Sequence, residues 1–318
     1  MNPERTRVTS RLLRTRARAL KRHLPAAAAG DDHGVHQARV ATRRLREAMP
    51  VLTGGVKHSK AGKARRKIRR LTRALGAVRE TDVTLHILAE LAQAGNLPRT
   101  AIEEVRAHLI AERDRRRTMM LDRLEHVNVD KLGRRLSSVA EALQQTDSEG
   151  WRDILSKRLL KRSRRLAERV GEAGQMYAPD RLHEVRIAAK KLRYALELAA
   201  DSRTAGAAAL LRPIKRVQDL LGRLHDLQVL QSHLAEVQAG PGASRPGMHH
   251  ALETVARQLE DECRHLHGRY LMTAGTLSEV CARVADEVVP GLQAPPIRRA
   301  LKMGLVRKPA GRAAGAQR

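Results

Sequence analysis

Residues 35–46 read VHQARVATRRLR and residues 182–193 read LHEVRIAAKKLR, so one basic motif occurs twice at an offset of 147 residues. At 3.6 residues per helical turn, the basic residues of each copy share one face of a helix and the apolar residues share the opposite face. Two basic helix faces, each backed by an apolar stripe, indicate a site for a multivalent anion. The basic faces consist of His36, Arg39, Arg43 and Arg46 in the first copy and His183, Arg186, Lys190 and Arg193 in the second.

The repeat extends beyond the motif in both directions. Upstream, residues 11–14 (RLLR) correspond to residues 158–161 (RLLK) at the same offset. Downstream, residues 75–83 (LGAVRETDV) correspond to residues 221–229 (LGRLHDLQV) at an offset of 146. Duplication of a unit of several helices explains this order and predicts two similar helical subdomains related by a pseudo-two-fold axis. Arg79 stands where the second half has His225, so we expect the halves to contribute unequally.

The composition indicates a helical protein with an aliphatic core and a strong positive charge. Lys and Arg total 62 of the 318 residues against 34 acidic residues, which gives a formal net charge of +28 and a pI near 11.4. Such a charge favours a polyanionic partner. The chain has one Trp, three Tyr and no Phe. Leu, Ala and Val at helical spacing must therefore build the core, which favours an all-α fold.

The cysteine content and the hydropathy indicate a soluble cytoplasmic protein. Cys263 and Cys281 are too few and too far apart for a disulfide framework or a Cys-rich zinc site, which favours a reducing compartment. The N-terminal residues carry no apolar export signal, and no stretch approaches about 18 uninterrupted apolar residues.

Helical periodicity runs from Thr6 to Val289, with short interruptions rich in Gly, Pro or Asp. Breaks are predicted at residues 25–34, 53–55, 95–98, 171–179 and 240–247, and residues 131–150 bridge the two halves. We assign residues 1–290 to one domain with subdomains at about 6–147 and 148–290. Residues 291–318 are basic and rich in Pro, Gly and Ala, so we expect a disordered tail.

Other helices also carry basic stripes at helical spacing. Like charges three or four residues apart repel one another, and few acidic residues are interleaved to offset the cost. A single stripe is typical of a solvated face, but six stripes, three in each half, indicate a shared ligand. Arg predominates over Lys, which suits bidentate contacts with phosphate oxygens. The supporting residues are Arg11, Arg14, Arg18, Lys63, Lys67 and Arg70 in the first half, and Arg158, Arg162, Arg165, Lys215 and Arg216 in the second.

The paired motifs resemble the CHAD domain, the conserved histidine α-helical domain. The resemblance rests on residues 36–39 with 43–46, on residues 183–186 with 190–194, and on the segments 75–82 and 221–226. It covers about residues 6–290. It implies two pseudo-symmetric four-helix bundles with a basic central surface or pore that binds inorganic polyphosphate, on polyphosphate granules in the bacterial cytoplasm. Some family members are fused to a triphosphate-processing CYTH domain. This chain has no room for one and looks like the stand-alone form.

We therefore predict a non-catalytic polyphosphate site with no metal and no cofactor. Neighbouring cations should lower the pKa of the motif histidines when the site is empty, and bound phosphate should raise it. We expect His36 and His183 each to donate a hydrogen bond to a phosphate oxygen or to position the neighbouring arginine. A half-buried histidine satisfied by backbone is the alternative role. The principal residues are His36, Arg39, Arg43, Arg44 and Arg46, with His183, Arg186, Lys190, Lys191 and Arg193.

Three other classes of site fit the sequence less well. No histidine pair at i, i+4 has a carboxylate partner that stands out as a metal site. Glu80, Asp82 and Asp226 are too sparse to hold Mg²⁺ for phosphoryl transfer, and we expect them to pair with arginines inside the bundle. Clustered arginine also suits nucleic acid, although only four aromatic residues are available to stack on bases. Non-specific binding to duplex DNA or RNA backbones, helped by the basic tail, is the alternative function.

Overall fold

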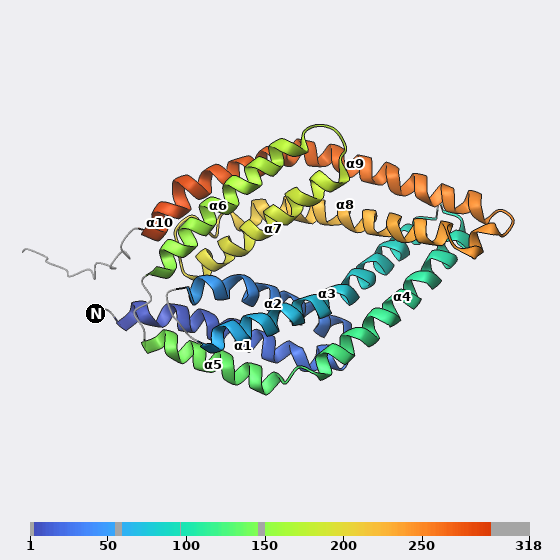
Figure 1. Cartoon of the computed structure of the whole chain (residues 1–318). Coiled ribbons are helices and arrows are strands. Elements are labelled where there is room, and N and C mark those ends of the chain that lie inside the picture. The colour runs from blue at the N-terminus through green and yellow to red at the C-terminus, as the bar shows by residue number, and fades with distance from the viewer. Residues whose placement is uncertain (1–2, 55–58, 96, 146–149, 294–318) are drawn as a thin grey trace, which may run out of the picture.

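The computed structural model describes residues 3–54, 59–95, 97–145 and 150–293, and these residues form helices joined by short turns (Figure 1). No strand occurs among them, so the all-α prediction is confirmed. The first half contains α1 (Pro3–Ala28), α2 (Asp32–Leu52), α3 (Ser59–Gln93), α4 (Arg99–Glu125) and α5 (Val129–Gln145). The second half contains α6 (Gly150–Ala173), α7 (Pro179–Asp201), α8 (Leu211–Gln238), the 3₁₀ turn η1 (Pro241–Ser244), α9 (Met248–Arg283), the π-helical turn η2 (Val284–Val288) and α10 (Val289–Gln293).

The two halves pack their helices in the same order. In the first half, α1 packs on α2, α2 on α3 and α3 on α4; in the second, α6 packs on α7, α7 on α8 and α8 on α9. Figure 1 shows α1 to α5 on one side of an elongated molecule and α6 to α10 on the other. The halves meet where α2 contacts α7, α3 contacts α8, and α4 contacts α8 and α9. This order fits the predicted two-half organisation, while the duplication itself stays a prediction.

The core is aliphatic, as the composition predicts. Leu13, Leu45 and Leu75 are fully buried in the first half, as are Leu159 and Leu192 in the second. Trp151 and Tyr270 are the largest fully buried side chains. None of the helices in the described ranges has both the length and the apolar character to cross a membrane.

The structure departs from the sequence-based boundaries in three places. The segment predicted as a bridge contains α5, which packs on α1 and α3 and adds a fifth helix to the first half. Helix α1 continues through Pro25 because the following alanines are strong helix formers. Of the predicted tail, residues 291–293 belong to α10 and Leu292 is buried; residues 294–318 lie outside the described residues. The predicted boundary at residue 147 also falls in an undescribed segment, between α5 and α6.

The turn between α1 and α2 depends on Gly34. The Asp31 side chain caps α2 by accepting a hydrogen bond from the backbone N–H of Gly34. A Cβ atom at position 34 would lie 2.7 Å from the backbone nitrogen of Ala27, which is too close without a shift of the backbone. Glycine therefore lets α2 begin directly against the end of α1, just before the first basic motif.

We expect Gly34→Ala to lower the free energy of unfolding by ~1–3 kcal/mol, because the overpacking outweighs the gain in helix propensity. Urea unfolding followed by circular dichroism measures this change. The matched control is Gly268→Ala in α9, where an added Cβ meets open space. Without a clash, this control should be neutral or stabilising by up to ~1 kcal/mol. Equal effects at both positions would contradict the close approach of α1 and α2.

Candidate functional site

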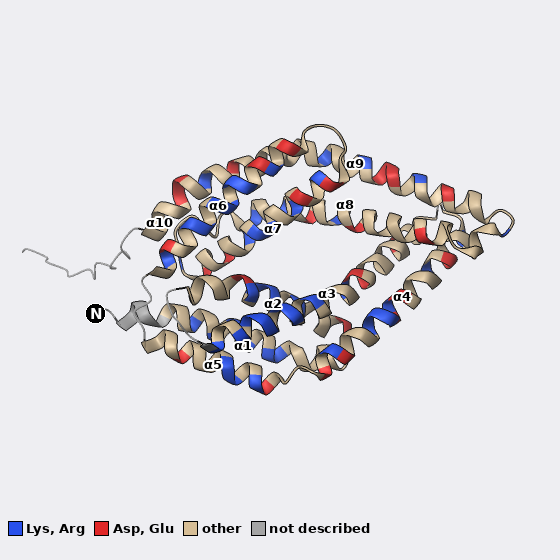
Figure 2. Ribbon diagram, viewed as in Figure 1, with Lys and Arg blue, Asp and Glu red and all other residues tan. Residues whose placement is uncertain are grey.

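Four basic residues from the two halves act on one another where α2 packs on α7. Arg39 and Arg43 come from α2, and Arg186 and Lys190 come from α7. The charges of Arg43 and Arg186 lower the pKa of Arg39, and the charges of Arg186, Arg43 and Arg39 lower the pKa of Lys190. We call these four residues the central basic cluster. Figure 2 shows basic residues on both helices, as well as on α1, α3 and α6.

The amphipathic pattern of each motif produces this arrangement. In α2, Ala38, Ala41 and Leu45 are buried in the first half, so the basic residues between them remain on the other side of the helix. In α7, Val185 and Leu192 are buried in the same way. When the two halves pack through α2 and α7, the basic sides of these helices are brought together.

Burial and mutual repulsion make the cluster electrostatically costly in the free protein. Burial contributes most to lowering the pKa of Lys190 from its usual 10.5 to about 6, and the neighbouring cations add to it. The same two causes lower the pKa of Arg39 to about 10. Moreover, Arg39 Nε is buried with no hydrogen-bond partner among the described residues. An anion placed here would supply both the missing negative charge and the missing acceptor.

Neutral imidazoles border the cluster in the second half. His183 Nδ1 lies 3.2 Å from His225 Nδ1, and their ring centroids are 4.7 Å apart. Burial and the charges of Arg186, His183 and Lys190 lower the pKa of His225 to about 3. The pKa of His183 is also lowered, by burial and then by Arg186 and Lys190. Both rings are therefore neutral at pH 7. One Nδ1–H donates to the other Nδ1, so the accepting ring keeps a free Nε2–H donor without adding positive charge.

In the first half, His36 occupies the position that corresponds to His183. Burial, followed by the charges of Arg79, Arg39 and His33, lowers its pKa, and its Nδ1 is buried without a hydrogen-bond partner in the described structure. The lowered pKa values of His36 and His183 agree with the expectation from their cationic neighbours. His225 was not among the predicted site residues. The repeat contained a signal for it, because His225 stands where the first half has Arg79.

The carboxylates near the cluster pair with arginine, as predicted. Asp82 accepts a hydrogen bond from Arg113 Nε at 2.7 Å, and Glu80 lies 3.4 Å from Arg116. Asp226 lies 4.0 Å from Arg186. Burial raises the pKa of Asp226, although the nearby cations, Arg186 first among them, oppose this shift.

Several predicted binding residues instead form ion pairs that tie the halves together. Arg44 of α2 binds Glu197 of α7 at 3.0 Å, and Arg162 of α6 binds Glu47 of α2 at 2.5 Å. Their positive charge is thus already balanced by a carboxylate. Three further predicted residues use the same carboxylates or their surroundings: Arg46 pairs with Glu47, Arg193 pairs with Glu197 and donates to Gln218, and Arg158 donates to the Glu47 carbonyl oxygen.

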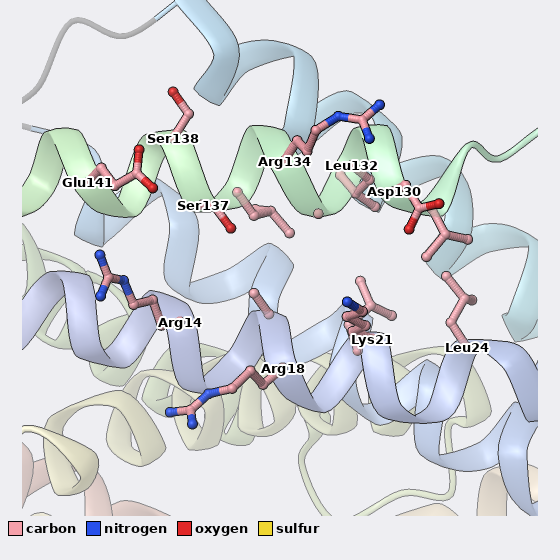
Figure 3. A pocket seen from close by; sticks show the side chains of 15 residues that line it. Arg14, Arg18, Lys21, Leu24, Asp130, Leu132, Arg134, Ser137, Ser138 and Glu141 are labelled. Atoms are coloured by element: carbon pink, nitrogen blue, oxygen red, sulfur yellow. The ribbon is translucent and has the colours of Figure 1, made fainter.

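Residues of the α1 basic stripe line hollows beside α5. Arg14 and Arg18 line a groove of 910 Å³ between α1 and α5, together with Lys21 and Arg134 (Figure 3). Arg11 lines a smaller hollow beside it, where Arg14 donates a hydrogen bond to Gln144 at 3.1 Å. The charges that act on the cluster come from α2, α3, α7 and α8. The expectation that the α1 stripe supports one shared surface is therefore not met.

The remaining predicted residues are spread over other surfaces. Lys67 donates to the His126 carbonyl oxygen at 2.9 Å, and Lys215 pairs with Asp219 at 2.7 Å. Arg165 lies 3.7 Å from Glu168. The others are exposed side chains, namely Lys63, Arg70, Lys191 and Arg216.

A sequence profile of the CHAD domain matches residues 11–235. The chain belongs to the CHAD domain family. Two solved structures share its fold. The crystal structure of the CHAD domain from the plant Ricinus communis aligns with a TM-score of 0.63 at 22% sequence identity, over 86% of this chain and 91% of that one. PptA from Streptomyces chartreusis aligns with a TM-score of 0.61 at 15% identity, over 86% of this chain and 99% of that one. No curated protein sequence matches significantly.

Lys190 should destabilise the free CHAD domain at neutral pH. The unfolded lysine keeps its proton up to about pH 10.5 and the folded one only up to about pH 6, so the unfolded state binds more protons between these values. Stability should therefore rise with pH over this window. We expect Lys190→Met to stabilise the protein at pH 7 by ~1 kcal/mol or more and to remove this part of the pH dependence. Urea unfolding at pH 6, 7 and 8 measures both effects.

The matched control is Lys191→Met, because Lys191 is exposed and follows directly in α7. It should leave the stability and its pH dependence unchanged. If Lys190→Met destabilised the protein, the assignment of an electrostatic cost to Lys190 would be wrong.

Proposed function

We propose that the central basic cluster binds inorganic polyphosphate. One observation carries the proposal: Arg39, Arg43, Arg186 and Lys190 from two halves of the chain are placed within electrostatic reach of one another. Their mutual repulsion and burial cost free energy in the unliganded protein. A chain of phosphates that contacts both halves would offset that cost with charge-assisted hydrogen bonds. Membership of the CHAD family supports the same ligand.

The chemistry of the surrounding groups favours phosphate chains over nucleic acid. The arginines offer forked donors that match phosphate oxygens, and the neutral His183–His225 pair adds one free N–H donor. Only four aromatic residues exist in the chain, and Trp151 and Tyr270 are fully buried. Few aromatic side chains are therefore available to stack on bases, and such stacking supports the binding of single strands. A thin, flexible ligand without bases fits a contact surface shared by two packed helices.

We propose binding without turnover and, as its consequence, association of the protein with polyphosphate granules. The acidic groups whose charges act on the cluster are Glu80 of α3, which raises the pKa of Arg39, and Asp226 of α8, which raises that of Lys190. Each lies within ion-pair distance of an arginine. Carboxylates engaged by arginine in this way differ from the free carboxylate cluster that holds Mg²⁺ for phosphoryl transfer. Release of inorganic phosphate from the bound chain would contradict this part of the proposal.

The decisive variant replaces Arg39, Arg43, Arg186 and Lys190 with Ala. We expect its affinity for long-chain polyphosphate to fall by at least ~100-fold, because each residue contributes a charge-assisted contact. Equilibrium titration with labelled polyphosphate at physiological salt measures this loss. The matched control removes four exposed arginines of α4 and α9, Arg106, Arg123, Arg257 and Arg269, and therefore has the same net charge. It should bind within a few-fold of the unmodified protein.

Equal losses in the two variants would indicate a generic basic surface and would refute the site. Thermal unfolding of both proteins establishes that they are folded. Competition against labelled duplex DNA at matched phosphate concentration then separates the two ligand classes. Polyphosphate should displace DNA at a much lower phosphate concentration than DNA displaces polyphosphate. The reverse order would favour the nucleic-acid alternative.

Binding should also depend on pH through Lys190. Its pKa is about 6 in the free protein, and a bound polyanion should raise it, so binding takes up a proton above pH 6. We expect the affinity to rise as the pH falls from 8 to 6 at constant ionic strength. In Lys190→Arg the residue keeps its charge and this rise should be much smaller. An identical pH profile in both proteins would exclude Lys190 as its source.

A further inference from the structure

Two histidines and a glutamate meet where α4 of the first half packs on α8 of the second (Figure 1). His108 comes from α4, and His233 and Glu236 are one turn apart on α8. His233 is buried, His108 is half-buried and Glu236 is exposed to solvent. In the described part of the chain, this is the one group of three potential ligands whose donor atoms lie within 4.8 Å of one another.

The spacing of the three donor atoms matches the coordination shell of a small divalent cation. Glu236 Oε2 lies 2.9 Å from His108 Nε2 and 3.1 Å from His233 Nδ1, and the two ring nitrogens are 3.4 Å apart. Zinc bound tetrahedrally at about 2.0–2.1 Å separates its ligand atoms by about 3.3 Å. An ion therefore requires only small movements of side chains that already converge.

In the free group the two rings compete for a single carboxylate oxygen. For Glu236 Oε2 to accept from both rings, each facing nitrogen must carry a proton, and the two N–H groups then lie side by side. With an ion in place, both nitrogens offer lone pairs and the carboxylate balances part of the metal charge. Two imidazoles and one carboxylate are a common zinc ligand set, with a fourth position left for water.

We propose that His108, His233 and Glu236 bind a zinc-class divalent cation that ties α4 to α8. The bound ion would link the two halves, because His108 is 125 residues from His233 and 128 residues from Glu236 in the sequence. Glu236 lies on the solvent side, so the ion has a path of entry and the fourth position faces water. The sequence alone predicts no metal site here, because only the packing of α4 on α8 completes the set of ligands. The site shares no residue with the central basic cluster and is independent of the polyphosphate proposal.

The test uses full-length protein freed of any affinity tag, stripped with a chelator and measured without polyphosphate, which itself binds divalent ions. Zinc is titrated in competition with a chromogenic chelator. We expect one tight equivalent in the unmodified protein and at least ~10-fold weaker binding in Glu236→Gln and in His108→Gln. Cobalt added instead should give the visible absorption of a tetrahedral site in the unmodified protein alone.

The matched controls are His249→Gln and Glu253→Gln, which alter another His–Glu pair at 3.2 Å that has no third ligand among the described residues. They should keep the full zinc affinity. Glu236 is exposed, so its variant should fold normally, and thermal unfolding without zinc verifies this. Zinc should raise the melting temperature of the unmodified protein more than that of Glu236→Gln. Absence of a tight equivalent, or equal loss in the controls, would overturn the site.

Discussion

The partial burial of Arg39, Arg43, Arg186 and Lys190 beside one another is the constraint on which the arrangement of the surrounding charges depends. Packing α2 on α7 brings these like charges together, and burial weakens their solvation. Cross-half ion pairs hold the helices in place. Arg44 binds Glu197, Arg162 binds Glu47, and Arg16 of α1 binds Asp201 of α7 at 2.7 Å. The charged residues near this interface thus divide into close pairs that join the halves and a cluster of cations with little compensation, in which Asp226 lies 4.0 Å from Arg186.

This division explains why basic side chains of similar appearance have different roles. Arg43 and Arg44 are neighbours in the sequence, yet Arg44 is paired across the interface while Arg43 contributes to the charge that depresses the pKa of Lys190. Affinity for a ligand comes from the second kind, because an arginine already bound to a carboxylate must lose one partner to gain another. The exposed pairs within single helices, such as Lys215 with Asp219, contribute little to either role.

Much of the fold was predictable from the sequence because its signals are local. Helical periodicity marks the helices, and the repeated motif identifies α2 and α7 and the four residues of the central basic cluster. The sequence did not reveal which arginines are neutralised. Glu197 stands four residues after Arg193, a spacing that indicates this one pair. The partner of Glu197 on α2 and the partner of Glu47 on α6 are more than a hundred residues away. The α1 stripe has the same periodicity as the others, and only the position of α5 directs it to a separate groove. Likewise, nothing in the sequence links His108 with His233, and only the packing of α4 on α8 brings them together.

The low pKa of Lys190 also has a chemical consequence. Near pH 7 most of its ε-amine is unprotonated, and an unprotonated amine is a nucleophile, whereas an ordinary surface lysine is almost entirely an inert ammonium. In the free protein Lys190 should therefore react with small acylating reagents out of proportion to its exposure. A polyanion that restores its proton would switch that reactivity off. The reactivity of the Lys190 amine should therefore differ between the empty and the filled site.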